Sequence, residues 1–200
     1  MKTLWLDTID STNSEALRRL AELPSMTVLA AREQTAGRGQ RGNTWFTEPG
    51  KNLTFSIVLK FGEGELHASQ VHWLNYLISV VVADFLQSHG IWCKVKWPND
   101  VYVGKNKICG ILIENTLETG MVRDSIVGIG LNLNECNWPT ELPNPVSLGE
   151  LTGRTYVPET ELEALHKEIR RRFGQLASSD GRCSLQEEFG KLMFRLPEAP

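Results

Sequence analysis

The sequence predicts one α+β domain, in which helices pack on one side of a mixed, largely antiparallel sheet. Two patterns support this prediction. Short apolar segments of strand length recur with turn residues between them, and residues 71–86 repeat apolar side chains at helical spacing. The composition, 41% hydrophobic and 22% charged over 200 residues, is typical of a globular protein with one substantial core.

Strands are expected where apolar and β-branched residues cluster. These segments are residues 3–6, 26–32, 53–60, 94–97, 101–103, 107–115 and 121–133. Turn sequences such as Pro98-Asn99-Asp100 and Gly104-Lys105-Asn106 separate the last four segments. The spacing therefore indicates a meander of mainly antiparallel strands.

Helices are expected over residues 13–22, 71–86, 158–177 and 185–193. Thr12-Asn13-Ser14-Glu15 has the form of a capping box at the start of the first helix. Gly90 lies where a left-handed C-cap of the second is expected, and Pro158 occupies a first helical position in the third. Three prolines within residues 134–150 predict an irregular surface loop.

Charge and hydropathy exclude several classes of protein. The formal net charge of -3 argues against nucleic-acid binding through the overall field. No apolar stretch is long enough to cross a bilayer, and Asp7 comes too early for a signal peptide. We therefore expect a cytoplasmic protein whose partners include neither nucleic acid nor membrane. With no C-x-x-C pair, the cysteines are expected to be buried thiols: Cys93, Cys109, Cys136 and Cys183.

A glycine-rich stretch, Gly37-Arg38-Gly39-Gln40-Arg41-Gly42, matches the pattern G-x-G-x-x-G. A dinucleotide-binding turn needs a helix directly after the glycines, which Pro49 and Gly50 prevent, and a Walker A loop would need Gly-Lys-Ser/Thr. Two interpretations remain. The stretch is either an exposed turn without a ligand or a loop that folds over a carboxylate or phosphate, with Trp45 and Phe46 beside it.

Two further segments carry unusual residues in apolar strands. Strict alternation places Lys107, Cys109 and Ile111 on one face, with Gly110 leaving room for a close neighbour. An inward lysine requires an anion, whereas an edge lysine would only protect the hairpin from aggregation. In Gly128-Ile129-Gly130-Leu131-Asn132, the glycines indicate either a close approach to the sheet or a bulge.

The motifs together resemble one family. They are Asp10-Ser11-Thr12-Asn13-Ser14, the stretch Gln34 to Gly42, Lys96-Trp97-Pro98-Asn99-Asp100, Lys107 to Glu114 and Gly128 to Asn132. In this order and spacing, over roughly residues 4 to 190, they resemble the bacterial biotin protein ligases, or biotin–[acetyl-CoA-carboxylase] ligases. The resemblance implies a core like that of the class II aminoacyl-tRNA synthetases and biotin ligases.

The resemblance also implies a reaction. Biotin and ATP would form biotinyl-5′-adenylate and pyrophosphate with Mg²⁺, and the biotinyl group would then pass to one lysine of a biotin carboxyl carrier protein. Positioning and preplaced positive charge from Lys107, Arg38 and Mg²⁺ would accelerate the first step, with no covalent nucleophile on the protein. No tightly bound metal is expected, and the protein would be a monomer or a homodimer.

The resemblance assigns the site residues to two ligands. Expected contacts to biotin are Ser11, Thr12, Asn13, Gln34, Gly37, Arg38, Gly39, Gln40, Trp45, Lys107 and Gly110. Expected contacts to ATP and the adenylate are Arg38, Arg41, Asn99, Asp100, Lys107, Asn132 and Trp138, with Asp100 also on the magnesium ion.

Three departures from the family pattern shape the expectations. Gln40 stands where well-known members have a third arginine in the loop. A helix-turn-helix domain does not fit before Leu4, so a repressor function is not expected. Residues 1–190 would be the catalytic domain and residues 191–200 the start of a C-terminal segment, with the family's small β-barrel absent or truncated.

Two alternatives remain open. Lipoate and octanoate ligases or transferases share the fold but carry an Arg-Arg-x-Ser-Gly-Gly-Gly loop that this chain lacks. The other alternative is an inactive biotin-binding relic. The presence of both Arg38 and Lys107 speaks against it.

Overall fold

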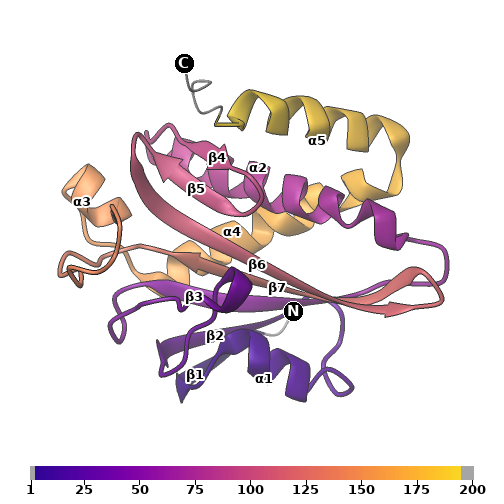
Figure 1. The fold of residues 1–200 in the computed structure, drawn as a ribbon, viewed down its shortest axis with the longest axis horizontal. Helices are drawn as coiled ribbons and strands as arrows, with labels where there is room; N and C mark the ends of the chain where they lie inside the picture. Colours follow the sequence, from indigo (N-terminus) through magenta and orange to yellow (C-terminus); the bar gives the residue numbers. More distant parts are fainter. Residues whose placement is uncertain (1–2, 195–200) are drawn as a thin grey trace.

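The computed structural model describes residues 3–194, which form a seven-stranded sheet in the order β1-β2-β3-β7-β6-β5-β4 (Figure 1). The strands are β1 Thr3–Ile9, β2 Thr27–Gln34, β3 Leu53–Lys60, β4 Lys94–Lys96, β5 Asp100–Val103, β6 Asn106–Glu118 and β7 Met121–Leu131. Only β1 and β2 pair in parallel among these strands; the remaining neighbours are antiparallel. The predicted mixed, largely antiparallel sheet is therefore confirmed.

The helices are α1 Thr12–Arg18, α2 His72–Ser88, α3 Leu148–Thr152, α4 Pro158–Phe173 and α5 Ser179–Leu192. The short α3 begins inside the segment predicted to be an irregular loop, residues 134–150, and ends two residues beyond it. A capping box explains it, since the Ser147 side chain accepts from the Glu150 backbone N–H while Glu150 reaches back to Ser147. The pattern Ser147-x-x-Glu150 was therefore a sequence signal for the start of this helix.

The main core lies between the sheet and the helices α2, α4 and α5. Alternate residues of β3, Phe55, Ile57 and Leu59, are buried in this core. Val58 points to the other face, where it packs with Ala16 of α1. Both faces of β3 are thus covered, and all of its residues except Lys60 are buried.

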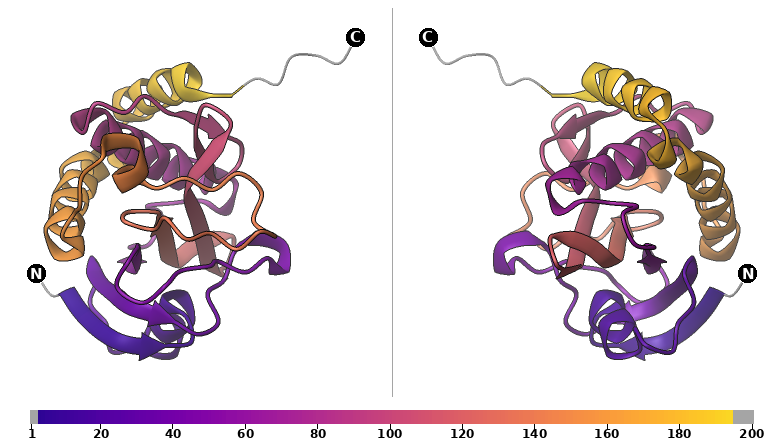
Figure 2. Two further views of the ribbon diagram at one scale, coloured as in Figure 1. Left: turned by 90° about the vertical axis from the view of Figure 1, so that its left-hand side faces the viewer. Right: turned by 90° about the vertical axis from the view of Figure 1, so that its right-hand side faces the viewer.

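Helix α1 lies on the opposite face of the sheet from the main helical layer, and at the other end of the molecule from α5 (Figure 2). The prediction that helices pack on one side is therefore wrong for α1. The parallel pairing of β1 and β2 is the reason, because it requires a crossover segment, and the crossover carries α1 onto its own face.

Of the cysteines, Cys93 and Cys109 are buried as predicted, and burial raises the pKa of the Cys93 thiol to about 11. Cys136 and Cys183 are exposed, so the prediction is wrong for them. Cys136 lies in the loop after β7, and Cys183 lies on the solvent side of α5. No apolar layer covers either position.

The chain after α5 runs beside β4. Helix α5 continues through Leu192, and the Phe194 N–H donates to the Val95 carbonyl at 2.8 Å. The segment predicted for residues 191–200 lies outside the described residues from position 195 onward, as do residues 1 and 2. Between residues 3 and 194, no helix combines the length and apolar character needed to cross a bilayer.

Candidate functional site

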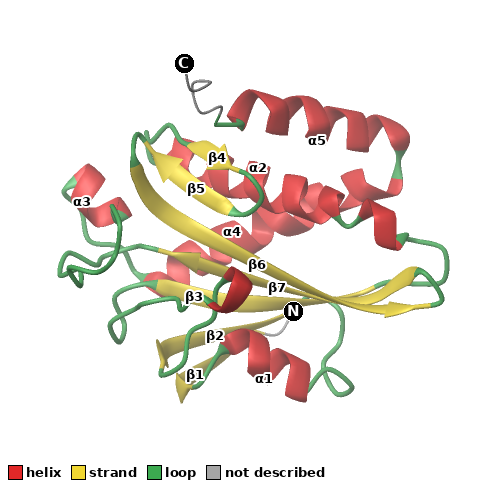
Figure 3. Ribbon diagram, viewed as in Figure 1, coloured by secondary structure: helices red, strands yellow, loops and turns green. Residues whose placement is uncertain are grey.

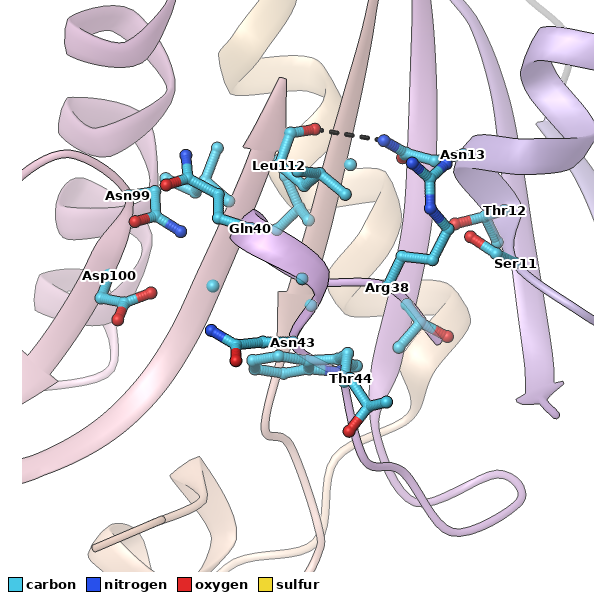
Figure 4. A pocket seen from close by; sticks show the side chains of 18 of the residues that line it. Ser11, Thr12, Asn13, Arg38, Gln40, Asn43, Thr44, Asn99, Asp100 and Leu112 are labelled. Atoms are coloured by element: carbon cyan, nitrogen blue, oxygen red, sulfur yellow. Dashed lines mark hydrogen bonds between the residues drawn. The ribbon is translucent and has the colours of Figure 1, made fainter. Parts of the chain in front are cut away.

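The face of the sheet that carries α1 also holds a cavity of about 390 Å³, bounded by α1, the glycine-rich stretch and β5 to β7 (Figure 4). Most of the predicted site residues line it: Ser11, Thr12, Asn13, Gln34, Arg38, Gly39, Gln40, Arg41, Trp45, Asn99, Asp100, Lys107 and Gly110. Segments distant in sequence thus meet at one place, as the motif pattern predicted.

A second hollow of about 380 Å³ adjoins the first. Asn132 and Trp138, predicted to contact the nucleotide, line it together with Tyr102. The two hollows share five residues in their walls: Asn43, Thr44, Trp45, Asp100 and Lys107. These residues therefore lie where a ligand in one hollow would meet a ligand in the other.

The glycine-rich stretch forms a hairpin. The Trp45 N–H donates to the Gly37 carbonyl at 2.9 Å, and the Gly39 N–H donates to the Asn43 carbonyl at 2.7 Å. A Cβ on Gly37 would lie 2.4 Å from the Trp45 carbonyl oxygen, so only glycine fits there. The hairpin contains a single 3₁₀ turn, Gln40–Gly42, and no helix follows Gly42 before β3, which confirms the exclusion of a dinucleotide-binding turn.

The start of α1 differs from the predicted capping box. Ser11 is the N-cap and makes no side-chain capping bond. Instead the Gln34 side-chain oxygen accepts from the Thr12 backbone N–H at 2.8 Å and from its hydroxyl at 3.1 Å. The predicted capping box is wrong because Gln34 of the neighbouring strand β2 caps the helix. Glu15 pairs with Arg18 instead.

Asp10 fixes the turn that leads into this helix. Its carboxylate accepts from the Ser11 backbone N–H at 2.7 Å and pairs with both terminal nitrogens of Arg18. The Arg18 guanidinium, followed by the Ser11 N–H, lowers the pKa of Asp10 to about 2. The carboxylate therefore stays charged throughout the ordinary pH range.

Asn13 is buried and fully engaged within the protein. Its amide nitrogen donates to Glu114 at 2.9 Å, and its amide oxygen accepts from the Ser56 hydroxyl at 2.6 Å. A Cβ on Gly128 would lie 2.2 Å from that oxygen, which explains one glycine of β7. Sequence reasoning missed Ser56, although a serine between Phe55 and Ile57 in a mainly apolar strand was the signal.

Lys107 lies on the face opposite to the one that alternation predicted. Val101 pairs with Cys109 and Tyr102 pairs with Lys107, so Ile108 is an extra residue in a β-bulge. Ile108 and Cys109 both enter the main core, whereas Lys107 joins Gly110 in the cavity wall. The prediction is corrected because a bulge shifts the alternation of side chains by one.

The lysine is held by an anion and an aromatic ring. Its ammonium nitrogen lies 2.8 Å from the Asp100 carboxylate and 5.5 Å from the centre of the Trp45 ring. Strand β6 is interior to the sheet, between β5 and β7, which rules out the edge-lysine alternative. On the cavity face, Lys107 therefore meets an anion of the protein itself, the Asp100 carboxylate.

Trp45 lies in a slot made by two glycines. Gly110 of β6 and Gly130 of β7 are paired across the strands, and a Cβ on either would come within 2.8 Å or 2.3 Å of the indole. The close approach predicted from the glycines is therefore made by a side chain of the protein. Within the described residues the buried indole N–H has no hydrogen-bond partner, which leaves it available to a ligand.

Three other predicted residues have different surroundings. Asn132 is buried, and its amide donates to the carbonyls of Lys107 and Val146, so it holds the following loop against β6. The Trp138 indole N–H donates to Glu150 of α3 at 3.1 Å. Arg41 is exposed in a left-handed conformation with φ of 57°, at the tip of the hairpin.

Glu135 was not predicted. It lies in the loop after β7 and contacts the loop between β2 and β3; loops are drawn green in Figure 3. It is completely buried and accepts from the backbone N–H groups of Glu48, Cys136 and Asn137. A carboxylate in a predicted surface loop gave no sequence signal for such a role. Its acceptor oxygens therefore connect the loop that contains Phe46 to the loop that contains Trp138, and both of those residues line the second hollow.

Replacing Glu135 with alanine should lower the free energy of unfolding by roughly 2 kcal/mol, since buried N–H groups lose a charged acceptor. Glu135→Gln retains one acceptor oxygen and should lose less. Urea denaturation measures both, with Glu141→Ala as the control because Glu141 is exposed in the same loop. Equal urea midpoints for Glu135→Ala and Glu141→Ala would contradict this role.

Comparisons with known proteins agree with this geometry. Residues 5–132 match the model of the biotin/lipoate A/B protein ligase family. The biotin–[acetyl-CoA-carboxylase] ligase of Paracoccus denitrificans is 36% identical over 178 residues, which cover 84% of this chain and 71% of the relative. This chain belongs to the biotin/lipoate A/B protein ligase family.

Other members of the family align over different lengths. The bifunctional ligase/repressor BirA of Escherichia coli is 40% identical over 129 residues, which are 64% of this chain but only 39% of that protein. The biotin protein ligase of Aquifex aeolicus in complex with biotin and ATP superposes with a TM-score of 0.83 at 27% identity, covering 98% of this chain and 79% of that one. The family fold thus extends through nearly the whole chain.

Proposed function

We propose that this protein activates biotin with ATP to biotinyl-5′-adenylate and transfers the biotinyl group to a lysine of a biotin carboxyl carrier protein. One observation carries the proposal: Lys107 and Asp100 lie where the two hollows meet. Biotin in the cavity beside α1 and ATP in the hollow beside Trp138 would bring the carboxylate and the α-phosphate together there. The Aquifex relative in complex with biotin and ATP supports the pair of ligands.

The residues at the junction suit this chemistry. Attack of a carboxylate on a phosphate brings two anions together, so a fixed ammonium group stabilises the transition state. Lys107 supplies it, and its pairing with Asp100 keeps the ammonium group in place before ligands arrive. No side chain is required as a covalent nucleophile, because the biotin carboxylate itself attacks and pyrophosphate leaves.

The side chains fit magnesium as a companion of the nucleotide. The part of the chain that the structure describes has no group of three or more His, Cys, Asp or Glu side chains able to hold a metal. Magnesium bound through nucleotide phosphates needs only one or two protein carboxylates, and Asp100 offers one in both hollows. The bound ion would neutralise charge on the phosphates.

The substrate class is tested by parallel assays. Protein supplied with ATP and Mg²⁺ should release pyrophosphate with biotin but not with lipoate or octanoate, and should label an apo carrier domain at one lysine. If pyrophosphate is released with lipoate or octanoate but not with biotin, the assignment of biotin as the substrate is wrong. Calorimetric binding of biotin without pyrophosphate release would support the inactive relic.

A further inference from the structure

Arg38 is held at one end of the cavity, far from the junction of the two hollows. Its two terminal guanidinium nitrogens donate to the two carboxylate oxygens of Glu114, at 3.1 Å and 2.6 Å. Figure 4 shows Arg38 reaching toward Asn13, on the side opposite Asn99 and Asp100. The Arg38 guanidinium, expected to be catalytic, thus points toward Glu114 and away from Asp100.

The positions along β6 explain this separation. A Cβ on Gly110 would lie 3.6 Å from the Lys107 side chain, which places Gly110 at the junction. Glu114 follows four residues later on the same face of the strand, roughly 13 Å along it. One arginine cannot hold Glu114 bidentately and also contact the atoms that react beside Lys107.

Glu114 joins three segments of the chain. It accepts from Arg38 of the glycine-rich hairpin and from Asn13 of α1, while its own backbone belongs to β6. The Arg38 and Glu114 side chains remain 42% and 33% exposed, so solvent weakens the ion pair. Such a pair is strong enough to favour one arrangement and weak enough to release for ligand exchange.

We propose that Arg38 and Glu114 form a latch that closes the hairpin over the cavity, with Glu114 as a positioning residue. The inference rests on the proposed function for its catalytic consequence. Arg38 then acts by holding Gly39, Gln40 and Trp45 over the ligand, and Lys107 alone among these protein groups supplies charge to the reacting atoms.

Hydrogen exchange of the ligand-free protein tests the latch directly. Amides of residues 37–45 should exchange roughly fivefold faster in Glu114→Gln and in Arg38→Gln, equivalent to about 1 kcal/mol. The double variant should exchange no faster than either single variant, because both substitutions remove the same interaction. Glu118→Gln is the control, since Glu118 lies on the same strand outside the cavity and pairs with Arg123. Unchanged exchange in Glu114→Gln, or additive effects in the double variant, would overturn the latch.

Kinetics separates a positioning role from a catalytic one. The KM for biotin should rise roughly fivefold in both single variants, while adenylate formation at saturating biotin and ATP stays within about twofold. A loss of roughly a hundredfold at saturation in Arg38→Gln would place Arg38 on the reacting atoms and reject the proposal. If the unmodified protein does not activate biotin, the proposed function is wrong. The hydrogen-exchange experiment would still test the latch, because it needs no catalytic activity.

Discussion

Lys107→Ala is expected to slow adenylate formation by roughly two to four orders of magnitude while the fold survives. The ammonium group is the protein cation placed where the carboxylate and phosphate would meet, and its loss leaves the Asp100 carboxylate unpaired beside two anions. Each tenfold loss of rate corresponds to about 1.4 kcal/mol of transition-state stabilisation. Single-turnover measurement of adenylate formation gives the effect on the chemical step.

Lys105→Ala is the matched control for this substitution. Lys105 is exposed in the turn between β5 and β6, two residues from Lys107, and lines neither hollow. Lys107→Ala combined with Asp100→Asn separates loss of the cation from exposure of the anion. A rate for Lys107→Ala within about threefold of the unmodified protein would remove Lys107 from the mechanism.

Gly130→Ala should weaken ligand binding roughly tenfold or more and lower the free energy of unfolding by about 1–3 kcal/mol. The added Cβ would lie 2.3 Å from the Trp45 indole, so the ring must leave its slot between Gly130 and Gly110. Moving Trp45 disturbs a wall that both hollows share. Calorimetric titration with biotin and urea denaturation measure the two effects.

Gly190→Ala provides the comparison at a glycine without close neighbours. Gly190 lies in α5, and a Cβ there would meet nothing within 4 Å. Alanine at that position should stabilise the helix slightly and leave binding unchanged. If Gly130→Ala binds as tightly as Gly190→Ala, then Trp45 does not shape the site.

Regular elements were predicted well where local chemistry decides them. β3 was found at its predicted bounds, Leu53–Lys60, and Pro158 begins α4 with acidic residues early and basic residues late. The predicted helix to residue 177 ends instead at Phe173, and a 3₁₀ turn follows. Helix ends depend on packing as well as propensity, so such differences are expected.

The sequence by itself determined the class of fold, the strands and the motifs that meet in the site. Local patterns carry this information, because apolar periodicity and turn residues act over a few neighbouring positions. The tertiary structure decided how those residues are used: the bulge at Ile108 turns Lys107 into the cavity, and Gln34 caps α1 from another strand. It also paired Arg38 with Glu114, 76 residues apart. Partners this distant are chosen by the sheet register and the packing of the whole chain, which no local pattern contains.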